Sequence, residues 1–478
     1  MTDCTPEHRR PQAENDSQYE QVTFTFGDDV PTTLIFDADD IVTDAGLVPL
    51  RQIDERLGFI DLAARRIEDL RVPEMIVHPV PRLLREVVFA YAAGYEDAND
   101  HTPLRNDPLF KQVVGPINPK TVNPKAQSGL ASEATLSRLL GGRKLEGLGA
   151  LREVHVEQFA KVLGRNAPDV LTLDIDGYDA ETHGMQQLAL FNGYYEEQMY
   201  YPLHVSVAEY GFVVGIELRP GDAGPGTGAA ELLAPIIEFL RARYPKTKLR
   251  VRADAGFADP KLYALCEENG VEYANRMKMN NRLDELFAEH LIPRLYDGRA
   301  DRMRDGKRIF YHETMYRAGS WDQDRRVVLA LVQDMETGEE ARRVLVTNSA
   351  KSKQNVWSFY EHRGQSEQRI DEFKNHLRGE KLSCCEFANN AIKLELVAMA
   401  HNLLAAVRIL LPEGHELKRA TVSRLRLVLI KCAAMVKKTT RRLWLHASKH
   451  WPYRPFLMDL ARMAMAKRWN PTPVWDSG

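Results

Sequence analysis

Apolar residues recur at helical spacing over the first third of the chain. From Leu47 to Leu57 they follow one another at intervals of three or four residues, and the same spacing returns from Leu83 to Tyr91. Such intervals place side chains on one face of an α-helix. The pattern predicts a helical region over residues 39–165, which suits either a DNA-binding region or a plain helical bundle.

The periodicity changes at Asp169, where short runs of β-branched and apolar residues replace the helical spacing. Five strands are predicted, at residues 170–176, 203–207, 212–218, 249–254 and 271–274. Two amphipathic helices are predicted between them, at residues 229–244 and 260–269. The order of strand, strand, strand, helix, strand, helix, strand predicts an α/β fold with an RNase H-like core, a mixed sheet flanked by helices.

A β-rich insertion interrupts this core. Residues 309–316, 326–333 and 342–347 are predicted strands separated by polar turns, and a helical pattern resumes at Asn355 and continues past Leu377. The rest of the chain is helical in pattern and basic, with breaks at prolines.

The predicted organisation therefore has six parts. In chain order they are a loose acidic tail (1–38), a helical DNA-binding region (39–165), the first part of the RNase H-like core (166–278), the β-rich insertion (279–352), the last part of the core (353–405) and a basic helical C-terminal region (406–478).

The net charge of −3 over 478 residues is unevenly distributed. Residues 1–100 carry 9 Lys and Arg against 21 Asp and Glu, a net charge of −12, whereas residues 401–478 carry 15 against 4, a net charge of +11. A basic C-terminal region fits binding to phosphates, and it equally fits docking on the acidic N-terminus. Charge alone leaves both interpretations open.

Composition narrows the class of protein further. Hydrophobic residues make up 44% and charged residues 27%, the balance of a folded soluble protein. No run of about 18 apolar residues is present, and the polar start of the chain lacks the apolar core of a signal peptide, so we expect a cytoplasmic protein without membrane contact. Five cysteines without CxxC spacing predict a reduced, zinc-free chain.

Three acidic residues stand where the elements of such a core converge. Asp176 ends the first predicted strand, Asp254 ends the fourth, and Glu367 lies on the helix after the insertion, with gaps of 78 and 113 residues. Carboxylates on neighbouring strand ends and a facing helix can hold two Mg²⁺ ions about 3.5–4 Å apart for phosphoryl transfer. Any one acid at a strand end is more often a turn or helix-cap residue, so the prediction depends on all three in this order.

Asp174 is an alternative to Asp176 as the first ligand. The two residues are two positions apart on a strand, so their side chains point to the same side. Asp176 is favoured because it lies nearer the end of the strand, where Gly177 follows.

The region around Glu367 carries the most specific pattern. Tyr360, Arg363, Glu367 and Lys374 follow the spacing Y-x2-R-x3-E-x6-K, and offsets of three, four and seven place all four on one face of a helix. A charged stripe is usually a solvated face. At the third expected acid, however, the two cations can hold phosphates beside the metal ions, and the phenol can donate a hydrogen bond to the DNA backbone.

These residues resemble the Tyr-Arg-Glu-Lys signature of bacterial cut-and-paste transposases of the DDE class, and more narrowly the insertion-sequence family called the thirteen-eighty family. The resemblance covers residues 39 to 401, and members of that family often carry Thr where Tyr178 stands. The matching stretches are Gly94–Asp97 with Asn99–Asp100, Leu173–Asp179, His183–Gly184 with Phe191–Tyr195, Leu218–Gly221, Arg252–Phe257 and Tyr360–Lys374.

The resemblance implies a catalytic triad of Asp176, Asp254 and Glu367 that binds two Mg²⁺ ions, for which Mn²⁺ can substitute. It also implies a bacterial, nucleoid-associated homodimer that acts on double-stranded DNA with terminal inverted repeats and on target DNA.

Further roles follow from the same resemblance. Tyr360, Arg363 and Lys374 would contact the backbone of the transposon end. The insertion would help to hold the DNA end after cleavage. Trp321 is the candidate in the insertion for stacking on a flipped base, and a buried core tryptophan is the alternative.

The sequence thus predicts a metal-dependent transposase that cuts and joins DNA strands. A domesticated, catalytically inactive DNA-binding protein is the second hypothesis, although such relatives tend to lose the acidic triad, which is complete here. A carboxylate-based glycosidase is the third, but Arg363 and Lys374 beside Glu367 argue against it.

Overall fold

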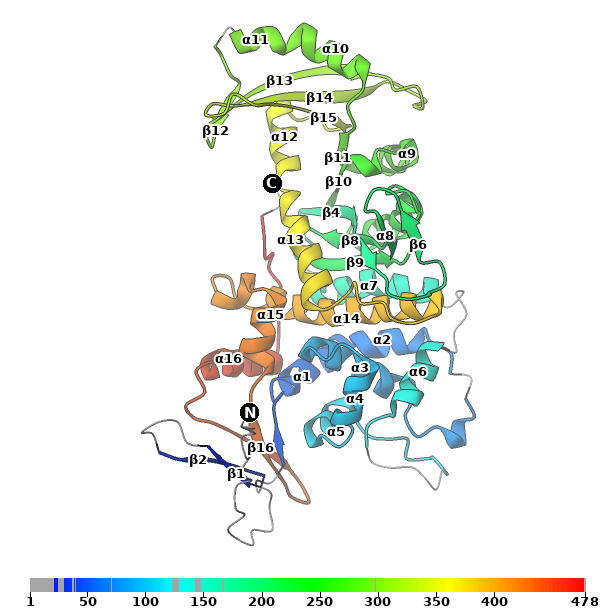
Figure 1. The fold of residues 1–478 in the computed structure, drawn as a ribbon, viewed down its shortest axis with the longest axis vertical. Coiled ribbons are helices and arrows are strands. Elements are labelled where there is room, and N and C mark those ends of the chain that lie inside the picture. Colours follow the sequence, from blue (N-terminus) through cyan, green and yellow to red (C-terminus); the bar gives the residue numbers. More distant parts are fainter. Residues whose placement is uncertain are drawn as a thin grey trace, which may run out of the picture.

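The computed structural model describes residues 21–24, 30–36, 38, 40–69, 71–122, 129–141, 148–165, 167–296 and 298–476. The first twenty residues of the predicted acidic tail lie outside this set. The described part of the chain is elongated, with three regions that follow one another along its longest axis (Figure 1). The insertion forms one end, the core sheet lies in the middle, and the N-terminal helices and most of the C-terminal region form the other end. The last residues of the chain return to the core, where Val474 and Trp475 donate to the carbonyl oxygen of Glu209.

A nine-stranded mixed sheet runs through the core and into the insertion, in the order β12-β13-β14-β15-β11-β10-β4-β8-β9. The core strands are β4 (Val170–Gly177), β8 (Leu203–Val207), β9 (Phe212–Glu217), β10 (Lys248–Ala253) and β11 (Glu272–Met277). β4 and β10 are parallel, as are β10 and β11, while β8 pairs antiparallel with both β4 and β9. All five strands predicted for the core are present.

The insertion extends this sheet and does not form a separate one. Its strands are β12 (Arg302–Arg304), β13 (Lys307–Tyr316), β14 (Arg325–Asp334) and β15 (Glu340–Thr347). β15 pairs antiparallel with β11, where Thr347 lies opposite Ala274. Helices α10 (Asn281–His290) and α11 (Ile292–Tyr296) cover one face of the insertion strands (Figure 1). One continuous sheet therefore joins the insertion to the strands that carry the predicted acids.

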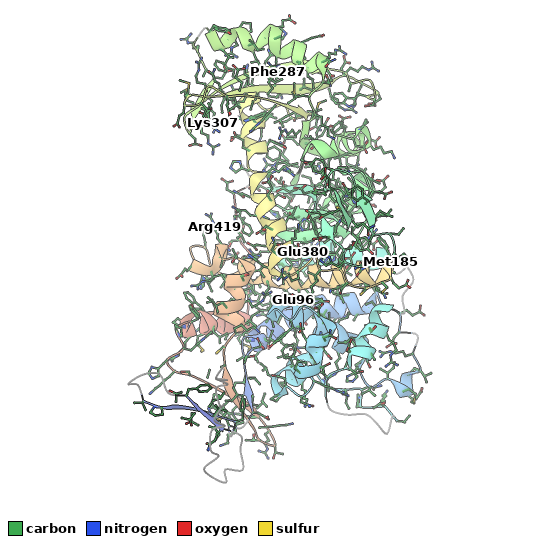
Figure 2. All side chains as sticks on the ribbon, viewed as in Figure 1. Glu96, Met185, Phe287, Lys307, Glu380 and Arg419 are labelled. Atoms are coloured by element: carbon green, nitrogen blue, oxygen red, sulfur yellow. The ribbon has the colours of Figure 1, made fainter. Side chains whose placement is uncertain are left out.

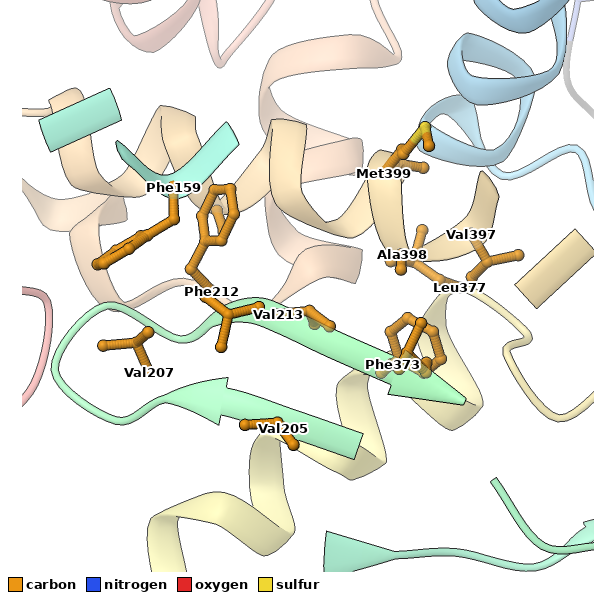
Figure 3. Close-up of a cluster of buried hydrophobic side chains, with 14 of the residues drawn as sticks. Phe159, Val205, Val207, Phe212, Val213, Phe373, Leu377, Val397, Ala398 and Met399 are labelled. Carbon is orange, nitrogen blue, oxygen red and sulfur yellow. The ribbon is translucent and has the colours of Figure 1, made fainter. Parts of the chain in front are cut away.

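Helices cover both faces of the core. α8 (Ala229–Arg243) and α9 (Pro260–Glu268) are the two predicted helices between strands, while α7 (Leu148–Leu163) and α14 (Phe387–Leu410) pack against β9. Phe159 of α7 contacts Phe212 of β9 at 5.4 Å between ring centroids, and Val397 and Met399 of α14 belong to the same buried cluster (Figure 3). This packing removes large apolar side chains from water and fixes the position of the sheet.

The predicted N-terminal helical region is helical in the structure. Its helices are α1 (Leu47–Leu57), α2 (Phe59–Arg65), α3 (Val80–Ala93), α4 (His101–Leu104), α5 (Pro108–Val114), α6 (Glu133–Gly141) and α7. α3 is buried along most of its length because α14 packs directly against it. The helical region is thus joined to the core through a shared buried helix.

The predicted helix from Asn355 onward is divided into segments. α12 (Lys353–Glu361) and α13 (Gly364–Asp371) are followed by a π-helical turn, η5 (Glu372–His376). Together they run from the insertion past the core sheet toward α14 (Figure 1). Beyond η5, Arg378 pairs with both Glu96 and Glu380, which ties the end of this segment to the N-terminal helical region. Figure 2 labels Glu96 and Glu380 where these two parts of the chain meet.

Both ends of the described chain contain strands where the sequence predicted none. β1 (Gln21–Phe24) and β2 (Thr32–Ile35) form a hairpin within the predicted loose tail. β16 (Ala434–Lys438) and β17 (Leu443–Ala447) form a second hairpin within the predicted helical C-terminal region, and β3 (Ile41–Val42) pairs with β16. Burial alternates along β16, where Ala434 and Val436 are buried and Met435 and Lys437 are exposed, but the apolar residues of both strands stand at consecutive positions, so the sequence shows no period of two.

A small sheet of β5 (Ala180–Glu181), β7 (Glu197–Tyr200) and β6 (Leu190–Asn192) is a further element that the sequence analysis missed. Its strands have two to four residues, too few for a clear periodic signal. In the described part of the chain, no helix is long and apolar enough to cross a membrane.

Candidate active site

The sheet brings the first two predicted acids to the same edge. Asp176 is the penultimate residue of β4, and Asp254 directly follows the last residue of β10. β4 and β10 are parallel neighbours in which Ala253 lies opposite Ile175, so both acids sit where their strands end. Asp254 also accepts a hydrogen bond from the backbone N–H of Gly256 at 2.8 Å, which fixes the turn after β10.

Gly177, the last residue of β4, allows Tyr201 to lie close to the backbone beside Asp176. A Cβ atom at this position would lie 2.9 Å from the ring of Tyr201, closer than such contacts occur. The backbone N–H of Gly177 donates to Asp176 Oδ1 at 3.0 Å. The Asp-Gly pair in the sequence thus has a steric reason, and it holds the Asp176 carboxylate at the strand end.

Arg363 connects the first and third predicted acids. Its guanidinium forms an ion pair with Asp176, and its Nη1 lies 3.4 Å from Glu367 Oε1 one helical turn away. The side chain of Asp176 is 14% exposed, whereas that of Glu367 is 70% exposed. Asp176 and Glu367 therefore face one cationic group from two different elements.

Burial raises the pKa of Asp176 to about 7, against the lowering effect of Arg363. The negative charges of Asp254 and Glu367 raise this pKa further. Both acids therefore act electrostatically on Asp176, as expected when like charges share a site. Perturbed carboxylates of this kind concentrate at functional sites.

Asp174 belongs to a different cluster. Its carboxylate accepts hydrogen bonds from Arg252 at 2.7 and 3.0 Å and from Arg369 at 3.2 Å, and its side chain is 1% exposed. Two guanidinium groups enclose this carboxylate, so its oxygens do not face Asp254 and Glu367 as Asp176 does. The geometry favours Asp176 over Asp174 as the first acid of the site.

The other residues of the Tyr-Arg-Glu-Lys pattern line the same segment. Tyr360 lies near the end of α12, half-buried beside Trp357, and Arg363 is buried in its pairing with Asp176. Lys374 lies on η5 and pairs with Asp179 at 2.6 Å and with Glu380 at 3.7 Å. The pattern therefore lies along one connected segment at the acid cluster, and its cations are paired within the chain.

Trp321 is enclosed in the structure. Its side chain is 6% exposed and packs edge-on against Tyr263 and Tyr316, each at 5.7 Å between ring centroids. The guanidinium of Arg325 lies 5.6 Å from the same ring. This packing agrees with the alternative of a buried core tryptophan, and the stacking of this indole on a flipped base stays a prediction.

Sequence reasoning gave no role to Arg219, which organises a loop beside Asp254. Its guanidinium donates to the carbonyl oxygens of Gly224, Pro225 and Thr227 at 2.7 to 3.2 Å. Pro225 in turn packs so closely on Gly256 that a Cβ at Gly256 would lie 2.6 Å from it. The signal was present, since Arg219 lies in one of the stretches that carried the family resemblance.

The donor set of the site suits a divalent cation. Asp176, Asp254 and Glu367 offer carboxylate oxygens, the ligands that Mg²⁺ and Mn²⁺ prefer. In the described residues no three His, Cys, Asp or Glu side chains are close enough to share one metal ion. The guanidinium of Arg363 supplies the positive charge between Asp176 and Glu367 in this structure.

These features define an α/β protein whose sheet edge and neighbouring helix gather an acidic site. The chain belongs to the family described as Transposase DDE domain group 1, which matches residues 24–468. It is therefore a transposase of the DDE class, a result that removes the glycosidase hypothesis.

Other comparisons add little to this assignment. The chain is similar to the piggyBac transposase in a cryo-EM structure of its synaptic complex with hairpin DNA, at 10% sequence identity and a TM-score of 0.35, over 76% of this chain and 75% of that one. No curated protein matches the chain.

Proposed function

We propose that this transposase cuts and joins the ends of a mobile DNA element by metal-dependent phosphoryl transfer, in a cut-and-paste reaction of the thirteen-eighty type. Asp176, Asp254 and Glu367 would be the ligands of the divalent ions. The observation that carries the proposal is the pairing of Arg363 with both Asp176 and Glu367, together with the electrostatic effect of Asp254 on Asp176. Inverted-repeat DNA, target DNA and a second copy of the chain would be its partners.

Divalent ions held by these carboxylates would activate a water molecule or a 3′-hydroxyl as the nucleophile and neutralise charge on the leaving oxygen. The chain's own residues prepare the site for such ions. Burial and like-charge repulsion leave Asp176 with an elevated pKa, so this carboxylate gains more from a nearby cation than an exposed one would.

Arg363 has a role that changes when DNA binds. Without a substrate its guanidinium pairs with Asp176 and Glu367. A phosphate diester offers this guanidinium two oxygens in the same planar geometry as a carboxylate. Transfer of Arg363 to the DNA backbone would release both carboxylates for the metal ions. Tyr360 and Lys374, on the same segment, would bind the neighbouring phosphates of the transposon end.

The test is cleavage of a labelled duplex that carries the inverted repeat flanking the gene, in Mg²⁺ and in EDTA. We expect wild-type protein to cut at the repeat boundary only with the metal, and Glu367→Gln to bind the duplex without cutting it. Glu340→Gln, an exposed acid on β15, serves as the matched control and should cut normally. Full cutting by Glu367→Gln would overturn the assignment of the site.

The alternative is a domesticated DNA-binding protein without catalysis. The complete set of three acids favours the enzyme. Specific binding by wild-type protein without cutting in Mg²⁺ or Mn²⁺, on a substrate that carries both paired ends, would favour the alternative instead.

A further inference from the structure

The hairpin of β16 and β17 lies in a segment with an unusual charge pattern. Residues 417–458 contain 11 Lys and Arg and not one Asp or Glu. Four of these cations, Lys437, Lys438, Arg441 and Arg442, stand at the tip of the hairpin, and all four are exposed. In the described part of the chain none of the four is paired with a carboxylate. The cations of the active-site segment, by contrast, are paired within the chain.

The outward face of the hairpin carries rings beside these charges. The antiparallel register places Lys437 opposite Trp444 and Met435 opposite His446, so these four side chains share one face. Trp444 is 47% exposed, and its ring is nearly parallel to that of His446, with an angle of 23° and 6.4 Å between centroids. The guanidinium of Arg442 lies 5.8 Å from the Trp444 ring. Exposed rings and cations on one face can together contact the sugars and phosphates of a nucleic acid.

The opposite face anchors the hairpin to the body of the protein. Ala434 and Val436 are buried, and β3 adds a third strand through Val42, which pairs with Ala434. At the base, Lys431 forms an ion pair with the buried Asp44 at 2.7 Å. The tip is therefore presented by a fixed base at the end of the molecule opposite the insertion (Figure 1).

We infer that this hairpin, residues 434–447, is a second DNA-binding element that binds the backbone of duplex DNA away from the active site. The inference rests on the proposed function for the identity of the DNA, and it adds a surface that the active site does not contain. The cations at the tip would pair with phosphates, and the Trp444 and His446 rings would lie against the sugar backbone. A two-stranded ribbon is narrow enough to enter the major groove of B-DNA.

Duplex DNA fits this surface better than a protein partner does. The phosphates of B-DNA give a dense and regular row of negative charge, and each neutralised phosphate releases counterions, so affinity falls as salt rises. A hairpin with several unpaired cations and no acidic residue matches such a row. A docking site for a folded protein would carry charges of both signs around an apolar centre.

The experiment measures binding in EDTA, where no strand is cut. Fluorescence anisotropy with a labelled 30-base-pair duplex of random sequence, and with one that carries the inverted repeat, is followed from low to high salt. The test variant is R441A/R442A, and the matched control is K246A/K261A, which removes two exposed cations from another surface. R441K/R442K keeps the charges and tests whether the loop itself is disturbed.

We expect R441A/R442A to bind both duplexes on the order of tenfold more weakly at low salt, with a salt slope smaller by about 2. R441K/R442K and K246A/K261A should bind like wild type. Trp444→Ala should weaken binding with little change in the slope, because a ring carries no charge.

Unchanged affinity and slope in R441A/R442A would overturn the inference. A change in oligomeric state on light scattering with unchanged DNA binding would also overturn it, and would assign the hairpin to protein contacts. The result is independent of the active-site test. Loss of binding in R441A/R442A together with normal cutting by Glu367→Gln would retain the hairpin and remove the catalytic assignment, and the reverse pair of results would do the opposite.

Discussion

Two carboxylates on one face of β4 have opposite surroundings. Asp174 is enclosed by two guanidinium groups, those of Arg252 and Arg369, and is shielded from solvent. Asp176, two residues further, shares one guanidinium with Glu367 and also experiences the charge of Asp254. The first cluster has more positive than negative charge, while the second has three carboxylates against one guanidinium. A closed ion-pair cluster can maintain the fold, whereas a cluster with an excess of negative charge can bind a cation.

The largest effect should come from the acidic cluster. Asp254→Asn removes one charge from the site while the turn hydrogen bond can persist, so we expect DNA cutting to fall by about a thousandfold or more, equivalent to about 4 kcal/mol in the barrier. The melting temperature should stay within a few degrees of wild type. Cleavage rates and thermal melts measure the two effects.

The matched control for this change is Asp284→Asn, which removes a carboxylate paired with Arg342 on the insertion surface. It should cut like wild type. A loss of cutting in Asp254→Asn that is accompanied by a collapse of stability would show that Asp254, like Asp174, is structural, and the contrast between the two clusters would fail.

A substitution in the closed cluster around Asp174 should lower the free energy of unfolding. Asp174→Asn leaves Arg252 and Arg369 buried with less compensation, and we expect a loss of about 3–5 kcal/mol in the free energy of unfolding. Asp176→Asn should cost far less, because it also relieves repulsion among three acids. Urea unfolding of the two variants in EDTA gives the comparison directly, and equal losses would contradict it.

Divalent ions should stabilise the protein only through the acidic cluster. A bound ion at a hundred times its dissociation constant adds about 2.7 kcal/mol to the free energy of unfolding. We expect Mn²⁺ to raise the melting temperature of wild-type protein and not that of Glu367→Gln. Arg363→Gln should bind Mn²⁺ more tightly, by roughly tenfold, since the competing guanidinium is gone. Titration calorimetry measures this affinity, and weaker binding in Arg363→Gln would contradict the proposed exchange.

The sequence predicted the core well because its strands are long enough to show their pattern. The five core strands and the three long strands of the insertion are present, and the acids of β4 and β10 meet because parallel strands end at a common edge. The pairing of Asp174 with Arg252 could not be predicted from the sequence, since it depends on the register of β4 against β10. Strands such as β5 and β16 were missed because short segments carry little periodic signal.

The residues around the site show the same limit. Glu367 and Arg363 were found through helical spacing, a local property of the sequence. Whether Arg363 faces a phosphate or Asp176 depends on how α13 packs on the sheet, 187 residues away along the chain. The burial of Trp321 likewise depends on Tyr263, which belongs to α9 of the core and not to the insertion. Tertiary contacts of this kind cannot be predicted from the periodicity or spacing of residues in the sequence.

The smallest expected effect tests which force dominates at Asp176. Burial raises its pKa to about 7 while Arg363 lowers it. If burial dominates, the folded state holds a proton that the unfolded state, with a pKa near 3.8, gives up. The stabilisation is then complete below the unfolded pKa and is lost as pH rises through about 7. In EDTA, the stability of wild type relative to Asp176→Asn should therefore fall between pH 5 and 7, by at most about 1.4 kcal/mol per pH unit. A difference that rises with pH would mean that the Arg363 pair governs the carboxylate, and that Asp176 resembles Asp174 more closely than its surroundings suggest.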